Sequence, residues 1–162
     1  MAADALVIYL NDHLGGSRAG MQLIENLVES TREPGVRASL AGVRDEIVAD
    51  RDVLENIIRK VSGDPSIVRE IGGWIGEKAA QLKLRMDDPA GGELRRFEAL
   101  ELMSLGIEGK SSLWRALAVI APSVPELADI DFGNLVRRAA EQRERVESLR
   151  TEAAREAFMP RR

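Results

Sequence analysis

Apolar residues recur at intervals of three and four along the beginning of the chain, the spacing of one face of an α-helix. This pattern predicts a helix over 3–30. Its inward positions form two adjacent rows, Val7, Leu10, Leu14, Ser17, Met21, Ile24 and Val28 in one and Leu6, His13, Gly20 and Leu27 in the other. The opposite side carries Asp4, Asn11, Arg18 and Glu25. We therefore expect an amphipathic bundle helix with that side in solvent.

Three further segments show the same spacing and predict helices over 35–61, 93–121 and 131–158. The inward positions of the first are Val36, Leu40, Val43, Ile47, Asp50, Leu54, Ile57 and Val61. Those of the second are Phe97, Leu100, Ser104, Ile107, Ser111, Trp114 and Ala118, and those of the third are Phe132, Leu135, Ala139, Gln142, Val146, Leu149 and Ala153. Local signals mark the boundaries, since Pro34 suits a first turn, Gly63 ends a helix and Asp131 is placed to cap one.

Between the second and third of these helices lies a weaker helical pattern over 65–85, interrupted by Gly72 and Gly73. It predicts a crossover element of one helix or two, and the surface around its Trp74 is the best candidate for association. Two hairpins joined by a long link are typical of a four-helix bundle with one long crossover connection. We therefore predict an all-α, antiparallel four-helix bundle with an additional crossover helix, forming a single domain over 1–162.

Composition narrows the possible functions. The net charge is -4 and the two signs alternate along the chain, so no basic block neutralises phosphates and we expect no binding to nucleic acid. The chain has no cysteine, which excludes a disulfide framework and a thiol site. No apolar run reaches the ~20 residues that span a bilayer, and the beginning of the chain lacks the pattern of a signal peptide. We therefore expect a cytoplasmic protein that does not enter membranes.

Two groups of glycines lie within predicted helices, where each glycine costs about 1 kcal/mol relative to alanine. The group in 3–30 consists of Gly15, Gly16 and Gly20. For it we expect close approach of another backbone, with room for a small ligand as the alternative. In 93–121, residues 109–111 look like the end of a phosphate-binding loop, but Ser104 stands where that motif needs its first glycine. We interpret Gly106 and Gly109 as sites of tight helix packing.

Polar residues on the inward faces predict a polar layer near the middle of the bundle. Folding the first two helices about the turn near residue 33 places His13 within one helical turn of Asp50. A buried charge is costly unless it is paired, so we predict a hydrogen bond between them. Folding the other two helices about residue 127 brings Gln142 near Ser111 and Glu108. Each of the four helices is thus expected to contribute a polar group.

The segments that supply this layer are 9–14 (Tyr-Leu-Asn-Asp-His-Leu), 45–50 (Asp-Glu-Ile-Val-Ala-Asp), 98–110 and 141–144 (Glu-Gln-Arg-Glu). With them, the chain resembles the ferritin-like superfamily. That resemblance implies two metal ions held by a Glu from each of two helices and a Glu-x-x-His pair from each of the others. Here Ala49 and Glu144 stand where those histidines would be, and His13 is the only histidine. The dinuclear motif is not intact, so oxidase, oxygenase and iron-storage activities do not carry over.

Two functional hypotheses follow. The first is a non-enzymatic, ferritin-like bundle that has lost its metal site and acts by self-association, as a homodimer, or by binding another protein. Under this hypothesis we expect no cofactor, and the polar layer fixes the register of the helices. The second is a bundle that binds one metal ion or a small ligand in the layer around His13. Its candidate ligands, with nitrogen and oxygen atoms that suit Fe, Mn or Zn, are His13, Glu46, Asp50, Glu101 and Glu108.

Overall fold

The computed structural model describes residues 2–63 and 92–159 of the chain. Within these ranges the chain forms four long α-helices and no strand: α1 (Ala2–Ser30), α2 (Pro34–Ser62), α5 (Gly92–Ile120) and α6 (Phe132–Phe158). Two short 3₁₀ turns, η1 (Ala121–Ser123) and η2 (Pro125–Leu127), join α5 to α6. The four long helices predicted from the sequence are confirmed, with bounds within one residue at each end. The helix predicted over 65–85 and the association surface at Trp74 lie outside the described residues.

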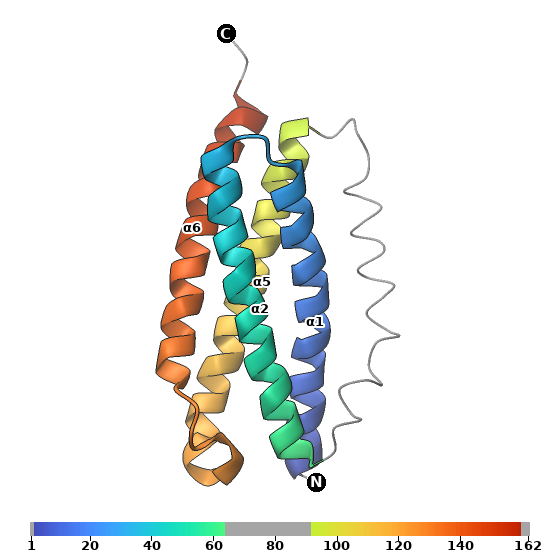
Figure 1. Ribbon diagram of the computed structural model, residues 1–162, viewed down its shortest axis with the longest axis vertical. Coiled ribbons are helices and arrows are strands. Elements are labelled where there is room, and N and C mark those ends of the chain that lie inside the picture. The colour runs from blue at the N-terminus through green and yellow to red at the C-terminus, as the bar shows by residue number, and fades with distance from the viewer. Residues whose placement is uncertain (1, 64–91, 160–162) are drawn as a thin grey trace.

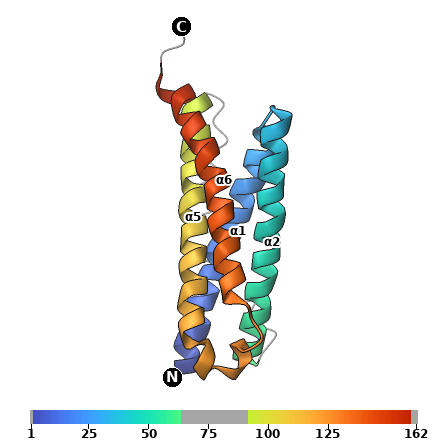
Figure 2. The ribbon, with the colours of Figure 1, turned by 90° about the vertical axis from the view of Figure 1, so that its left-hand side faces the viewer.

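The helices form a bundle of two antiparallel hairpins, α1–α2 and α5–α6 (Figures 1 and 2). Helix α1 also packs against α5, and α2 lies beside α6. Helices α2 and α5 run in the same direction, so α2 ends at the opposite end of the bundle from the start of α5 (Figure 1). This order of directions is the one expected for a bundle with a single long connection. No helix in the described ranges is both long and apolar enough to cross a membrane.

Helix ends are fixed by local hydrogen bonds. The Glu33 carboxylate accepts from the backbone amides of Gly35 and Val36, at 2.9 and 2.7 Å, and so satisfies donors that have no partner within the first turn of α2. Gly63 ends the same helix in the left-handed region, with φ of 66°, which costs glycine less than other residues. Asp131 caps α6 as predicted, because its carboxylate accepts from the backbone amide three residues further on at 2.9 Å.

The interior contains two apolar clusters with a polar layer between them. One cluster includes Ile24, Leu40, Leu100 and Val146, and the other includes Leu10, Ile57, Trp114 and Phe132. Along α2, Ile47 belongs to the first cluster and Leu54 to the second, and the buried Asp50 lies between them. The predicted polar position in the middle of this helix is therefore confirmed, and it marks the boundary between the two halves of the core.

The sequence pattern misplaced one residue of α1. Asn11 was expected on the solvent side, yet it is only 2% exposed. Its side-chain Nδ2 donates to the carbonyl of Val7 at 2.9 Å, while its Oδ1 has no partner among the described residues. Helical spacing marks the most apolar face of α1, but it does not show which of the remaining residues are buried in the folded chain.

Candidate functional site

The polar layer is a hydrogen-bonded network centred on the Asp50 carboxylate. Lys110 on α5 donates to Asp50 Oδ2 at 2.5 Å and also to Gln142 Oε1. Gln142 on α6 donates through Nε2 to Asp50 Oδ2 at 3.1 Å, and Arg138 Nη2 donates to Asp50 Oδ1. Three helices therefore meet at one carboxylate in the middle of the bundle.

Burial makes this network energetically consequential. Asp50 is 1% exposed and Gln142 is fully buried, so neither group exchanges its hydrogen bonds with water. A buried carboxylate is stable only when paired and hydrogen-bonded, and Lys110 and Arg138 supply both conditions. Burial of the Lys110 ammonium lowers its pKa below the ordinary value of 10.5, although the neighbouring Asp50 acts in the opposite direction.

The predicted His13–Asp50 hydrogen bond is wrong. Asp50 accepts from Lys110, Arg138 and Gln142 instead, and His13 stacks edge-on against Tyr9 with 4.7 Å between ring centroids. Aligning α1 with α2 about their turn took no account of α5 and α6, which approach Asp50 from the other side. His13 is half-buried, and this burial lowers its pKa below 6.5, with Asp12 opposing the shift.

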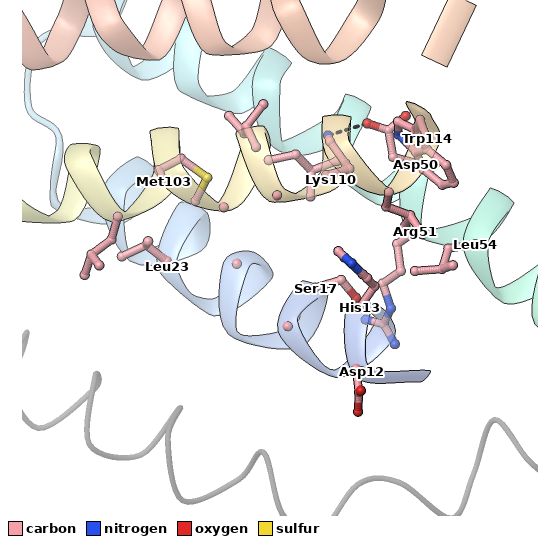
Figure 3. A pocket seen from close by; sticks show the side chains of 18 of the residues that line it. Asp12, His13, Ser17, Leu23, Asp50, Arg51, Leu54, Met103, Lys110 and Trp114 are labelled. Carbon is pink, nitrogen blue, oxygen red and sulfur yellow. Dashed lines mark hydrogen bonds and ion pairs between the residues drawn. The ribbon is translucent and has the colours of Figure 1, made fainter. Parts of the chain in front are cut away.

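A cavity of about 390 Å³ lies between α1, α2 and α5, next to the network (Figure 3). Apolar side chains make up most of its wall, among them Leu23, Ile47, Met103, Ile107 and Leu113. Asp50 and Lys110 form part of the lining, and His13 and Ser17 line it from α1. The cavity therefore combines an apolar body with a charged, hydrogen-bonded edge.

Glycines border this cavity on both facing helices, with Gly16 and Gly20 on α1 and Gly106 and Gly109 on α5. A Cβ atom added at any of the four would meet no described atom within 4 Å. The expected close backbone approach at Gly16 and Gly20 and the tight packing at Gly106 and Gly109 are therefore both wrong. These positions leave open space. The alternative drawn from the sequence for the group on α1, room for a small ligand, stays a prediction.

The structure does not bring the five candidate metal ligands together. Glu46 pairs with Arg145 at 2.5 Å and is not part of the cavity lining. Glu101 pairs with Arg150 at 3.5 Å. Glu108 pairs with Arg115 at 2.5 Å and with Arg143 at 3.5 Å. Of the five, only His13 and Asp50 line the cavity. No group of three or more His, Cys, Asp or Glu residues suited to a metal ion occurs within 2–63 or 92–159.

Sequence reasoning missed three groups of this site. Lys110 is three residues after Ile107 and four before Trp114, so helical spacing alone would have placed it on the inward face. Arg138 directly precedes Ala139, which is one of the inward positions of α6, and helical spacing gives no sign that the Arg138 side chain reaches Asp50. The indole N–H of Trp114 is the third group. Trp114 is fully buried and lines the cavity, and its Nε1 has no acceptor among the described residues.

Comparisons of the chain with protein-family models, with curated proteins and with solved structures found no match.

Proposed function

We propose that this protein is a small-molecule-binding helical bundle and that its ligand occupies the cavity between α1, α2 and α5. The observation that carries the proposal is the set of glycines facing open space on both sides of that cavity. A volume of about 390 Å³ falls within the range of small-molecule sites. The proposal develops the second hypothesis drawn from the sequence and requires no catalytic step.

The free-energy cost of glycine within a helix favours a ligand-binding cavity over an empty packing defect. Glycine in a helix interior costs about 1 kcal/mol relative to alanine. Glycine in a tightly packed bundle offsets this cost by allowing helices to approach, but here the described neighbours leave the space open. Alanine at Gly16, Gly20, Gly106 or Gly109 would strengthen both helices and also reduce the void. A bound molecule that needs this room gives glycine a function at these positions.

As a second proposal, the cavity binds a single Fe, Mn or Zn ion. Its support is that His13 and Asp50 both line the cavity. It receives less support than an organic ligand, because Asp50 is already hydrogen-bonded to two cations and the other candidate carboxylates pair with arginines. Kinship with the ferritin-like superfamily and assembly as a homodimer also stay predictions, and a ligand-binding role is compatible with both.

Binding of a neutral, apolar dye such as phenylnaphthylamine tests the proposed site. The dye should increase in fluorescence and saturate at one molecule per chain when it is titrated into the wild-type protein. Gly106→Leu places a branched side chain in the cavity and should weaken binding by about tenfold or more, as expected when a ligand loses most of its apolar contact area.

Gly42→Leu is the matched control. Gly42 lies in the first third of α2 and does not line the cavity, and a Cβ there meets only the end of Arg145 at 3.7 Å. Its substitution should leave the dye affinity unchanged. Equal affinities for wild type and Gly106→Leu, with both proteins folded by circular dichroism, would show that the dye binds elsewhere and would overturn the assignment of the cavity.

A further inference from the structure

The polar edge of the cavity carries an excess of positive charge. In the network, the two cations Lys110 and Arg138 face the single carboxylate of Asp50, so among the described residues one positive charge of the network has no counter-charge. The nearby Glu46 does not change this balance, because it is paired with Arg145. A negative charge placed at this edge would therefore be stabilised.

Charges at the other parts of the lining do not cancel that excess. Arg51 is paired with Glu55 at 3.0 Å, so together they are neutral. Asp12 is exposed, and its carboxylate points away from Lys110 and Asp50 (Figure 3). Charge on an exposed group is screened by water, whereas charge within the network is not. The electrostatic preference of the cavity is therefore set by Lys110 and its partners.

Two hydrogen-bond donors of the lining also have no acceptor in the part of the chain that the structure describes. An ammonium has three donors, and Lys110 uses two of them on Asp50 and Gln142. The Trp114 indole N–H has no acceptor among the described residues, although its side chain is fully buried. A buried donor without an acceptor is costly and rare in native proteins. Lys110 and Trp114 both line this one cavity, so a ligand group seated against the two side chains could provide the missing acceptor.

We propose that the cavity selects an apolar molecule that carries one carboxylate, with Lys110 and the Trp114 N–H as the groups that receive the carboxylate. This inference rests on the proposed function and specifies the class of ligand. The glycine-bordered, apolar part of the cavity holds the hydrocarbon body. A neutral ligand would leave the positive charge uncompensated, and a cationic ligand would add to it.

Isothermal titration of the full chain with three molecules that share one tail, decanoate, decanol and decylammonium, tests this inference. Decanoate should bind about tenfold or more tightly than decanol, as expected for a charge-assisted hydrogen bond. Decylammonium should bind more weakly than either. Lys110→Met should remove the preference for decanoate over decanol, and Trp114→Phe, which keeps an aromatic ring and removes the N–H, should reduce it.

Arg115→Met is the control, because Arg115 lies on the same helix but is exposed and does not line the cavity. It should leave the preference unchanged. Measurements on the wild type at rising pH provide a readout that needs no variant. The preference for decanoate should fall as Lys110 loses its proton.

The possible results separate the two proposals. Equal binding of decanoate and decanol by the wild type would overturn this inference and leave the proposed function standing. Tighter binding of decylammonium, or an undiminished preference in folded Lys110→Met, would also overturn it. Failure of all three molecules to bind would mean that the cavity is filled by another part of the protein or by a second copy, and would overturn both proposals.

Discussion

The two sides of α5 use small residues in different ways. Toward α6, the buried Ser104 hydrogen-bonds Glu147 of that helix, and α5 packs more extensively against α6 than against α1. Toward α1, Gly106 and Gly109 border a cavity with no described atom near their missing Cβ positions. Small residues therefore allow close packing on one side and leave space on the other. The difference shows that a small residue on an inward face does not by itself predict contact between helices.

The largest effect is expected where the two halves of the core meet. Asp50→Ala removes the carboxylate that pairs with Lys110 and Arg138, and takes from two partly buried cations the anion of the network. We expect a loss of about 3–5 kcal/mol in the free energy of unfolding, the usual cost of removing one member of a buried charge network. Urea unfolding followed by circular dichroism measures it.

Asp129→Ala is the matched control for that experiment, because Asp129 pairs with Lys60 at the surface at 2.8 Å. Exposed ion pairs contribute little to stability. A loss for Asp50→Ala as small as the loss for Asp129→Ala would show that the network does not hold the two halves of the core together.

A smaller effect on the free energy of unfolding, this time a stabilisation, is expected for a substitution on the cavity side of α5. Gly106→Ala should stabilise the ligand-free protein by up to about 1 kcal/mol, because alanine favours the helix and its Cβ enters open space. Gly63→Ala should destabilise it, since the left-handed φ of 66° at Gly63 disfavours a side chain. Thermal melting of both variants provides the comparison. Destabilisation by Gly106→Ala would mean that another group packs closely against that position.

The smallest expected effect is a dependence of the free energy of unfolding on pH. Because the folded pKa of Lys110 is lowered below its ordinary value of 10.5, the unfolded state binds more protons between these two values. Stability contributed by Lys110 should therefore rise with pH across this window. Wild type should gain stability relative to Lys110→Met as pH increases from neutral toward 10.5, measured by urea unfolding at each pH. A difference that stays constant or falls would contradict a lowered pKa.

Helical periodicity and end signals predicted the elements of this bundle well, because both act between residues close in sequence. The predicted inward positions of α6, from Phe132 to Ala153, are nearly all buried, and Leu149 is half-buried. Asp50 was likewise placed correctly on the inward face of α2. These positions follow from the geometry of a single helix, for which a residue's neighbours in the sequence are sufficient.

The partners of the inward residues followed from tertiary structure alone. Spacing shows that Asp50 and His13 are near inward faces, but not that Lys110 and Arg138 reach Asp50 first from α5 and α6. The spacing did not indicate Arg138, because its long side chain extends from beside the inward face of α6 to the interior of the bundle.

The amino-acid sequence by itself determined that the chain forms amphipathic helices, where most of them begin and end, and that a charged residue lies in the middle of α2. The tertiary structure decided which charges pair there, and that Gly16, Gly20, Gly106 and Gly109 border a cavity. The physical reason is that periodicity is a property of one helix, whereas pairing and empty space depend on distances between helices. Those distances are set by all the side chains of the interior together.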